Sequence, residues 1–309
     1  MISSVFRRLI VGFTVAALGI GAVEAAPSNK PKTTTKRSTT QKKTTASRKT
    51  QQQVKTEPVW RPVVGKEPPQ TAAASVMLVD ALTGRVLYEK NADERRAPAS
   101  TQKLLTALIV AEEGNLDKKV TFQPVDLQTE PVMLYAKPGD TYTRRQLLEA
   151  LLVKSFNDVA RALARDNAGS VEAFAVKMNR KAAELGMTSS HFVNPNGLTE
   201  PNQYSTARDM AKLALVAYHN PTLRQIFSIK ELPFRYANGR VTTFKNTNRV
   251  LRGWAPCNGM KTGYTMAAGH CLVSSASLNG RDVIAVVLGD NRQHIWHDSA
   301  SLLAWGLMR

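Results

Sequence analysis

The chain has 309 residues, a formal net charge of +18 and 43% hydrophobic residues. Residues 27–55 hold nine positive charges, no negative charge and almost no apolar side chain, so they cannot bury enough surface to offset the entropy of ordering. From about Thr71 to Arg309 the composition is that of a globular protein, and roughly 240 residues fit one domain with two lobes. Composition therefore excludes the N-terminal segment from the folded core.

Residues 1–25 have the parts of a secretory signal peptide. Arg7 and Arg8 form a basic start, residues 9–22 form an apolar run, and residues 23–25 (VEA) fit a small-x-Ala cleavage site. The apolar run is shorter than the about 20 residues of a transmembrane helix. We expect residues 1–25 to be cleaved and the protein to be exported to the periplasm or cell envelope. An uncleaved anchor is the alternative.

Residues 26–70 are expected to form a disordered linker, rich in Lys and Thr and then in Pro. A flexible cationic segment favours an anionic surface, so the cell envelope is a candidate partner for residues 27–55. Export argues against a nucleic-acid partner. A solvated spacer without a specific partner is the alternative.

Strand patterns lie at both ends of the globular part, and helical patterns lie between them. The first expected elements are a hairpin at 75–80 and 85–89 and a helix from Ser100. Four further helices then follow, at 145–153, 158–166, 171–185 and 207–218. The last elements are strands at 258–262, 270–275 and 283–288 and a helix at 299–305.

This order predicts an α+β fold in residues 71–309. Strands from the N-terminal and C-terminal ends would form one antiparallel sheet flanked by helices, and the central helices would form an inserted lobe. The functional site would then lie in the cleft between the sheet edge and this lobe.

Ser100 and Lys103 are the first candidate catalytic pair. Residues three apart share a helix face, and Ser100 lies at a helix start, where free N–H groups and the helix dipole favour a developing negative charge. A lysine whose pKa is lowered by burial and by another cation, here Lys261, can take the serine proton. Alone, the S-x-x-K pattern is weak evidence of catalysis, because an N-cap serine followed by a solvent-exposed helix lysine gives the same pattern.

Two further motifs follow in the chain. Ser155 and Asn157 form an S-x-N pattern on a loop that enters a helix. Lys261, Thr262 and Gly263 form K-T-G at a strand edge, where a glycine permits close approach and a substrate can add as a β-strand. Lys261 and Thr262 alternate in direction along a regular strand, so their convergence on a substrate needs a twist. An edge lysine that prevents aggregation is the alternative.

The three motifs S-x-x-K, S-x-N and K-T-G, in this order, are those of penicillin-binding proteins and serine β-lactamases. From about Ala73 to Leu307 the chain resembles the D-alanyl-D-alanine carboxypeptidase family of low-molecular-mass penicillin-binding proteins. Further matching segments are 192–198 (FVNPNGL), 204–211 (YSTARDMA), 246–248 (NTN), 259–265 (GMKTGYT) and 268–273 (AGHCLV).

The resemblance implies a fold similar to that of β-lactamases and DD-peptidases, and it implies a role for each motif residue. Ser100 would be the acylated nucleophile, Lys103 its base and Ser155 a proton relay to the leaving amine. Asn157 would hold a substrate amide.

The K-T-G strand would bind the substrate's C-terminal end. Lys261 and Thr262 would fix the terminal carboxylate beside Gly263, and the N–H groups of Ser100 and Tyr264 would form the oxyanion hole. Peptidoglycan stem peptides would be the substrates and β-lactams the covalent inhibitors, with no cofactor or metal.

Alternative functions stay open at this point. A DD-endopeptidase uses the same machinery on peptidoglycan cross-links. A class A β-lactamase needs a glutamate on a loop between the second and third motifs, and Glu172, Glu184 and Glu200 lie there without an E-x-x-L-N context. A non-catalytic wall-binding protein would not need the intact motifs.

Some residues leave their structural role open. Phe156 stands where the family has glycine, and we expect its ring to narrow the site. Cys257 and Cys271 flank a predicted hairpin whose centre lies near residue 266, which favours buried free thiols over a disulfide. The resemblance leaves a carboxylate-binding role of Arg292 open.

Overall fold

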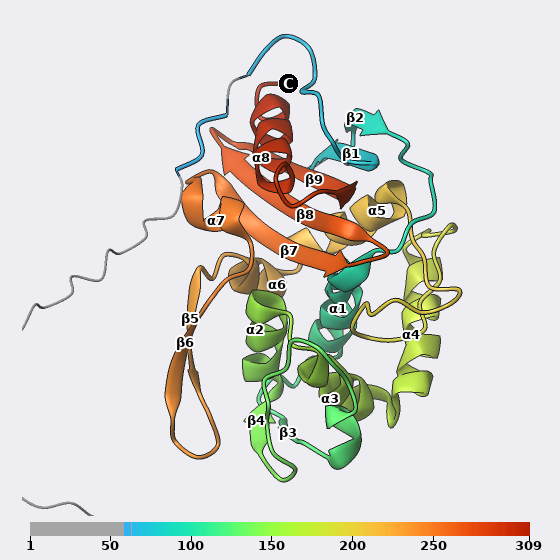
Figure 1. Ribbon diagram of the computed structural model, residues 1–309, viewed down its shortest axis with the longest axis vertical. Coiled ribbons are helices and arrows are strands. Elements are labelled where there is room, and N and C mark those ends of the chain that lie inside the picture. Colours follow the sequence, from blue (N-terminus) through green and yellow to red (C-terminus); the bar gives the residue numbers. More distant parts are fainter. Residues whose placement is uncertain (1–58, 63) are drawn as a thin grey trace, which may run out of the picture. The chain divides into compact units, whose positions relative to one another are not determined.

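The computed structural model describes residues 59–62 and 64–309, and the signal and tail predictions for residues 1–55 lie outside this part (Figure 1). Five antiparallel strands form the main sheet in the order β2-β1-β9-β8-β7. They are β1 (Ser75–Asp80), β2 (Val86–Lys90), β7 (Cys257–Thr265), β8 (Gly269–Leu278) and β9 (Arg281–Asp290). The predicted pairing of strands from the two ends of the chain is confirmed.

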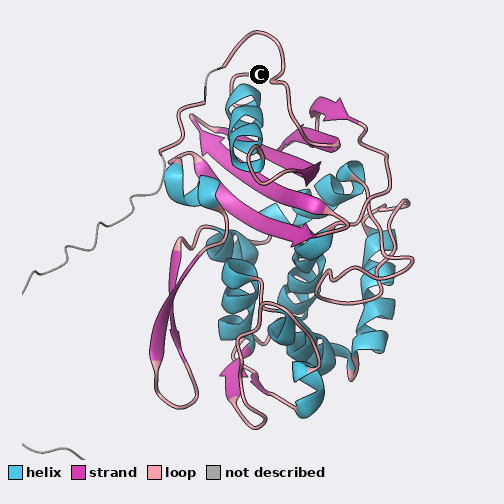
Figure 2. Cartoon of the chain, viewed as in Figure 1, coloured by secondary structure: helices cyan, strands magenta, loops and turns pink. Residues whose placement is uncertain are grey.

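Helices cover both faces of this sheet, and most of them gather on one side (Figure 2). The lobe between β2 and β7 contains η1 (Ala99–Gln102), α1 (Lys103–Glu113), η2 (Pro124–Leu127), α2 (Arg144–Lys154), α3 (Asn157–Ala168), α4 (Val171–Glu184), α5 (Ala207–His219) and α6 (Pro221–Phe227). The last helix, α8 (Ile295–Gly306), packs on the opposite face, and the short α7 (Arg249–Gly253) packs there with it through Val250 and Leu251. No helix in the described part is long and apolar enough to cross a membrane.

Two small hairpins were not predicted. They are β3 (Lys119–Thr121) with β4 (Thr141–Thr143), and β5 (Glu231–Arg235) with β6 (Val241–Lys245). The first is only three residues long on each side, too short for a visible alternation. The second contains Pro233 in its first strand, and a proline within a strand pattern argues against that assignment.

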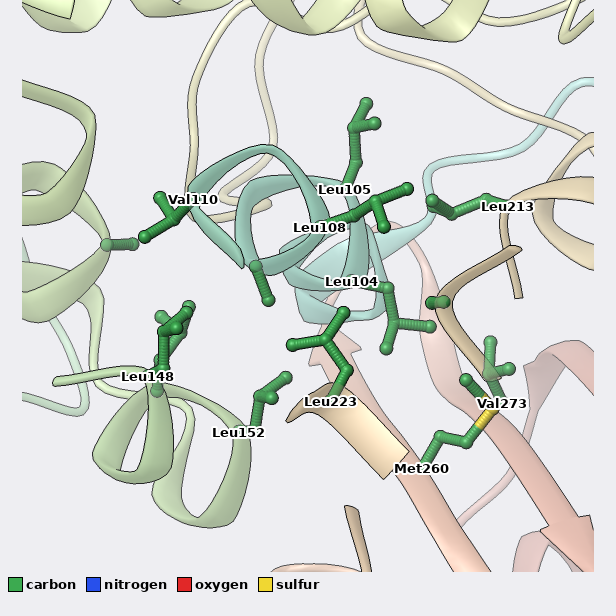
Figure 3. Close-up of a cluster of buried hydrophobic side chains, with 14 of the residues drawn as sticks. Leu104, Leu105, Leu108, Val110, Leu148, Leu152, Leu213, Leu223, Met260 and Val273 are labelled. Carbon is green, nitrogen blue, oxygen red and sulfur yellow. The ribbon is translucent and has the colours of Figure 1, made fainter. Parts of the chain in front are cut away.

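Two hydrophobic cores lie on the two faces of the sheet. The larger joins the sheet to the helical lobe, where Leu104, Leu105 and Leu108 of α1 meet Met260 and Val273 of the sheet (Figure 3). Because these three leucines are fully buried, each contributes about 1.5–3 kcal/mol by removal from water. The start of α1 is therefore held firmly against the sheet.

The smaller core lies under α8. Leu302 and Leu303 of α8 pack in one cluster with Leu272 of β8. Trp60 and Val64, which precede Thr71 in the chain, also pack against this cluster. Residues before Thr71, where the globular composition begins, thus already contact the folded domain.

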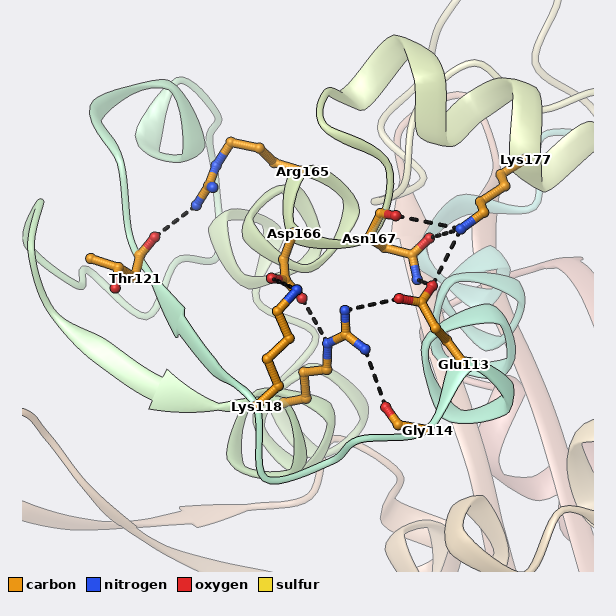
Figure 4. A network of polar contacts seen from close by, with 9 residues as sticks. Glu113, Gly114, Lys118, Thr121, Arg165, Asp166, Asn167 and Lys177 are labelled. Atoms are coloured by element: carbon orange, nitrogen blue, oxygen red, sulfur yellow. Dashed lines mark hydrogen bonds and ion pairs between the residues drawn. The ribbon is translucent and has the colours of Figure 1, made fainter.

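A buried arginine joins the helices of the lobe. Arg144 is 2% exposed, and its guanidinium donates to Asp166 at 2.7 Å, to Glu113 at 3.1 Å and to the Gly114 carbonyl at 3.1 Å. Lys118 also pairs with Asp166 at 2.8 Å (Figure 4). Since removing one member of a buried ion pair costs about 3–5 kcal/mol, this network fixes the start of α2 against the ends of α1 and α3.

The two cysteines are not paired. Cys257 and Cys271 are both buried free thiols, and in the β7–β8 register Cys271 lies opposite Gly263 while Cys257 lies opposite Ala276. Burial raises the pKa of Cys257 to about 12 and that of Cys271 to about 11. The expected free thiols are confirmed, and their raised pKa values make them poor nucleophiles.

Candidate active site

Ser100 lies at the start of a helix, as expected, but this first turn is a 3-10 turn, which is wound more tightly than an α-helix. Residues Ala99–Gln102 form a 3-10 turn that runs directly into α1. In such a turn residues three apart eclipse each other, and Ser100 Oγ lies 2.9 Å from Lys103 Nζ. Ala99, immediately before the serine, has φ +48°. A non-glycine residue in this region is strained, and such strain gathers at functional sites.

Lys103 is fully buried, and three oxygen atoms surround its amine. Nζ lies 2.7 Å from Asn157 Oδ1, 2.5 Å from the Asn196 carbonyl and 2.9 Å from Ser100 Oγ. The Asn157 and Asn196 oxygens can only accept hydrogen bonds. A neutral amine that donates to these two leaves its lone pair for the Ser100 hydroxyl proton.

The surroundings favour this neutral form. Burial lowers the pKa of Lys103 well below its usual value, the nearby Lys261 cation lowers it further, and the Asp158 carboxylate opposes the change. Lys261 is also fully buried, and burial lowers its pKa to about 7. Both causes agree with the expectation that burial and Lys261 together act on Lys103.

The loop of residues 194–197, which follows α4 in the chain, supplies one of the contacts to Lys103. Two hydrogen bonds hold this loop against η1 and α1. Gln102 Nε2 donates to the Asn194 carbonyl at 2.6 Å, and Thr106 Oγ1 donates to the Pro195 carbonyl at 2.7 Å. Gly197 has φ +83°, and a Cβ there would lie 2.1 Å from the Ala99 carbonyl oxygen. Only glycine fits this contact.

Ser155 and Asn157 lie where α2 ends and α3 begins, as predicted. Ser155 ends α2 with a left-handed φ of +68°, and Asn157 is the first residue of α3. The Asn157 side chain donates from Nδ2 to the Pro131 carbonyl at 2.5 Å, and its Oδ1 faces Lys103. Asn157 therefore links the lysine to the loop that contains Pro131.

A buried carboxylate holds the same loop. Asp158 Oδ1 accepts from Leu134 N at 2.9 Å, and Oδ2 accepts from Tyr135 N at 3.1 Å. Val132 and Tyr135 of this loop have positive φ values of 62° and 57°. The backbone of residues 131–135 thus docks on the start of α3 and forms a wall beside Ser100.

Lys261 and Thr262 point to opposite faces of β7. In the register Lys261 pairs with Val273, which belongs to the core of the helical lobe, and Thr262 pairs with Leu272, which belongs to the core under α8. Lys261 Nζ donates to the Thr262 carbonyl at 2.8 Å. Lys261 thus lies on the side of β7 that faces the helical lobe and Lys103, whereas Thr262 lines the second cavity at Ser100.

Gly263 lets the edge of β7 approach the serine. A Cβ at this position would lie 2.9 Å from both Ser100 N and Thr101 N, closer than side-chain atoms tolerate. The K-T-G strand therefore brings Gly263 and Tyr264 beside the Ser100 amide. The side chain of Thr262 bonds to Thr247, with 2.7 Å between the two hydroxyl oxygens.

Two cavities open at Ser100 and share Pro131, Val132, Ser155 and Tyr264 in their walls. The first, of about 430 Å³, continues past Leu198, Thr199, Thr265 and Met266. The second, of about 330 Å³, continues past Thr262, Thr247, Lys154 and Trp296. The cleft lies between the sheet edge and the helical lobe, where the site was predicted.

The expected narrowing of the site by Phe156 is wrong. Phe156 is 5% exposed and belongs to the large core, and it lines neither cavity at Ser100. Its ring stands edge-on to Phe244 of β6, with 5.2 Å between the ring centroids. The ring points into the lobe because the hairpin β5–β6, which was not predicted, offers an aromatic surface there.

Other candidate residues lie away from the serine. Glu172, Glu184 and Glu200 line neither cavity at Ser100, so none is placed like the deacylating glutamate of a class A β-lactamase. Arg292 is exposed and outside both linings, although its charge contributes to the lowered pKa of His270.

Asn196, Gly197 and Asp158 had no role in the sequence-based prediction. The N-P-x-G-L segment was seen only as a matching motif, and its glycine was the available signal for a close backbone contact. Asp158 follows Asn157 directly, but nothing local reveals that it binds the backbone of a loop more than twenty residues earlier.

The comparisons with known proteins agree with this geometry. A sequence profile of the D-alanyl-D-alanine carboxypeptidase family matches residues 62–292. D-alanyl-D-alanine carboxypeptidase DacB2 of Mycobacterium tuberculosis is 36% identical over 244 residues, covering 77% of this chain and 83% of the relative. D-alanyl-D-alanine endopeptidase of Escherichia coli is 35% identical over 245 residues, covering 77% and 78%.

Other relatives are longer. D-alanyl-D-alanine carboxypeptidase DacF of Bacillus subtilis is 36% identical over 222 residues, covering 70% of this chain, which spans 57% of the relative's length. Among solved structures, the M. tuberculosis D-alanyl-D-alanine carboxypeptidase superposes with a TM-score of 0.75 at 34% identity, covering 81% of this chain and 96% of the other. With three motifs converging on one buried lysine and a profile match over most of its length, the chain belongs to the D-alanyl-D-alanine carboxypeptidase family of serine peptidases.

Proposed function

We propose that this protein is a serine D-Ala-D-Ala carboxypeptidase that trims peptidoglycan stem peptides through an acyl-enzyme on Ser100. The observation that carries the proposal is the environment of Lys103. Its amine is fully buried, lies 2.9 Å from Ser100 Oγ and has two fixed acceptors for its own hydrogens. This arrangement suits a neutral base that takes the serine proton.

In the acylation step Ser100 Oγ attacks the carbonyl carbon of the penultimate residue, and its proton passes to Lys103. The oxyanion is stabilised by the N–H groups of Ser100 and Tyr264. The C–N bond then breaks, and Ser155 relays a proton from Lys103 to the departing amine of the terminal D-alanine. Water hydrolyses the resulting ester, which releases the shortened peptide and restores the serine.

The carboxylate of the substrate is recognised at Thr262. Thr262 lines the second cavity, and the Lys261 amine is buried between β7 and the helical lobe, outside the cavity wall. Lys261 thus contributes to carboxylate binding through its field and through the Thr262 peptide group rather than by direct contact. Asn157 Oδ1 contacts the Lys103 amine, and the Asn157 side-chain amide would hold a substrate amide.

A DD-endopeptidase is the second candidate, because the E. coli relative with that name is similar over nearly the same span. A β-lactamase is disfavoured by the absence of a glutamate from the walls of both cavities, and a non-catalytic wall-binding protein by the intact motifs. β-Lactams are proposed as covalent inhibitors that acylate Ser100.

We further propose that the protein is exported, with residues 1–25 as a cleaved signal peptide and residues 27–55 as a cationic segment that attaches to an anionic envelope surface. Residues 26–70 would link that segment to a catalytic domain at 71–309. The composition of residues 1–55 supports this proposal.

The test is intact-mass analysis with penicillin, followed by analysis of products from a pentapeptide. We expect one stable adduct on the wild type and none on Ser100→Ala. Lys103→Arg should also lose acylation, because Arg keeps its charge but cannot accept a proton. An adduct of unchanged amount on Ser100→Ala would exclude the proposed nucleophile.

A second experiment tests whether the enzyme recognises the terminal carboxylate of the substrate. A pentapeptide with a free terminal carboxylate should be cleaved far faster than its terminal amide, because the amide loses the charge and one acceptor. Thr262→Ala should reduce this preference more than it slows acylation by penicillin. Equal rates on acid and amide, with efficient cleavage of cross-linked dimers, would favour the endopeptidase.

A further inference from the structure

Asp158 is a fully buried carboxylate that the proposed mechanism does not use. It lies in the first turn of α3, where the helix dipole favours a negative charge. Oδ1 accepts hydrogen bonds from Leu134 N and Val159 N, each at 2.9 Å, and Oδ2 accepts one from Tyr135 N at 3.1 Å. Burial raises the pKa of Asp158, and these N–H groups oppose the rise, so backbone dipoles stabilise the charge of the carboxylate.

The loop that Asp158 holds is strained. Val132 and Tyr135 have positive φ values of 62° and 57°, a conformation that persists in non-glycine residues only where surrounding contacts hold it. Besides the Asp158 carboxylate, Asn157 N at the start of α3 donates to the Val132 carbonyl at 2.8 Å. Pro131 and Val132 line both cavities of the cleft. Asp158 therefore fixes a wall of the cleft, although it lines neither cavity itself.

The same carboxylate acts on the proposed base. Two charged groups change the pKa of Lys103: Lys261 of β7 lowers it, and Asp158 of α3 raises it. The remaining contacts of the amine are to neutral oxygens, those of Ser100, Asn157 and Asn196. Asp158 thus favours the protonated amine, which cannot accept the serine proton.

The docked loop reduces this opposing effect. The positive ends of two loop N–H dipoles, those of Leu134 and Tyr135, point at the Asp158 oxygens. In a buried site such dipoles compensate part of a charge. If the loop lifts, only Val159 N remains of these three donors, and more of the negative field reaches Lys103. The wall of the cleft and the protonation of the base are therefore linked through one side chain.

Resting on the proposed function, we infer that Asp158 is a positioning residue for acylation, which holds residues 131–135 as a wall of the cleft and lets Lys103 act as a base only while that loop is docked. Asp158 makes no bond to the substrate and exchanges no proton. An open loop leaves Lys103 beside a less compensated carboxylate. The reactive state is then the one in which the wall beside the substrate is already in place.

The first experiment measures the pH dependence of penicillin acylation in Asp158→Asn. The asparagine has a similar shape and lacks the charge, and its amide oxygen can still accept from Leu134 N and Val159 N. Removing the charge lowers the pKa of Lys103, so the acid limb should move to lower pH by about one unit. The plateau rate should fall, because the amide nitrogen cannot accept from Tyr135 N and the wall loosens. An acid limb at the wild-type pH or higher would overturn the link to Lys103.

Asp158→Glu should move the acid limb in the opposite direction. It keeps the charge, but its longer side chain displaces the N–H groups of the loop, so the carboxylate is less compensated and the pKa of Lys103 rises. The plateau rate should fall here as well. Acid limbs that shift in the same direction in Asp158→Asn and Asp158→Glu would show a general disturbance of the fold and overturn the inference.

Asp209→Asn is the matched control. Asp209 is also buried in the first turn of a helix, α5, and its Oδ2 accepts from Ser189 N at 2.8 Å, twenty residues earlier in the chain. It lines neither cavity and does not act on the pKa of Lys103. Its acid limb should stay at the wild-type pH. A shift like that of Asp158→Asn would contradict a specific role of Asp158.

Hydrogen exchange tests the docked loop without any measurement of activity. In the wild type the amides of Leu134 and Tyr135 should be protected. In Asp158→Asn the Tyr135 amide should exchange roughly tenfold faster, because it loses a charged acceptor. Unprotected amides in the wild type would overturn the inference even if no variant folds.

The two proposals fail in different ways. If the wild type is acylated on Ser100 and cleaves the pentapeptide, but the acid limb and the exchange rates do not respond to Asp158→Asn, only the role of Asp158 is wrong. If the wild type is neither acylated nor cleaves the pentapeptide, the proposed function itself fails, whatever the exchange rates of the loop.

Discussion

At the scale of single residues, the site contains a lysine whose pKa is lowered by its surroundings. Lys103 is buried among acceptors and near a second buried lysine. Burial lowers the pKa of Lys103 because it removes the charged amine from water, and the nearby Lys261 cation lowers this pKa further. The two lysines of separate motifs are therefore electrostatically coupled, and the charge on one lowers the pKa of the other.

Lys261→Met should shift the pH dependence of acylation to higher pH. Removing the Lys261 cation raises the pKa of Lys103, so that Lys103 is protonated over a wider range and the acid limb of the profile moves upward. The rate of penicillin acylation between pH 5 and 9 measures this. Lys261→Arg keeps the charge and should shift the acid limb less. An identical acid limb in wild type and Lys261→Met would show that Lys261 does not act on Lys103.

At the scale of elements, the site is formed where β7, η1 and the turn between α2 and α3 meet. Each approach depends on a local feature: a glycine at 263, the strained Ala99 and a left-handed Ser155. None of these elements contains the whole site, so small shifts between them change its geometry.

Gly263→Ala should separate β7 from the nucleophile turn. The new Cβ would lie 2.9 Å from Ser100 N, so the strand edge must move outward, and a displacement near 1 Å lowers the rate by roughly 100-fold. Stopped-flow acylation by penicillin measures the loss. Gly65→Ala is the control, because its Cβ would meet only the Glu67 carbonyl at 4.0 Å. Normal acylation by Gly263→Ala would contradict the close approach.

Phe156→Ala should lower stability rather than open the site. The ring is buried and packs on Phe244, and truncation of a buried Phe costs about 3–5 kcal/mol. Urea unfolding of wild type and variant measures the change in the free energy of unfolding. Acylation well below the unfolding midpoint should stay close to wild type. A faster reaction with bulkier β-lactams and unchanged stability would instead support the original expectation of a narrowed site.

At the scale of the whole molecule, charge is divided between the catalytic domain and the N-terminal segment. Nine of the positive charges lie in residues 27–55, which contain no acidic residue. The domain itself has its ion pairs distributed over the helices, with the Arg144 network as the buried example. Attachment and catalysis are therefore expected to separate.

A truncated protein that begins at Val59 should keep penicillin acylation but lose salt-dependent attachment to the cell wall. Attachment of the longer mature chain should weaken as salt rises, because charges are screened over about 8 Å at physiological ionic strength. Co-sedimentation with sacculi at low and high salt measures this. Equal sedimentation of both forms at low salt would reduce residues 27–55 to a spacer.

The sequence by itself determined the five strands of the main sheet, most of the longer helices, the position of the cleft and the candidate residues Ser100, Lys103, Ser155, Asn157, Lys261 and Thr262, because periodicity and motif spacing are local properties. It did not reveal the two small hairpins or the short helices α6 and α7. Tertiary structure decided that Lys261 faces the helical lobe and Thr262 the side of α8, since the choice of face depends on register. It also decided that Phe156 turns toward Phe244, that Asn196 contacts Lys103, and that a second cavity opens at Lys154 and Trp296. These contacts join segments roughly ninety to more than a hundred residues apart, and no local pattern specifies such distances.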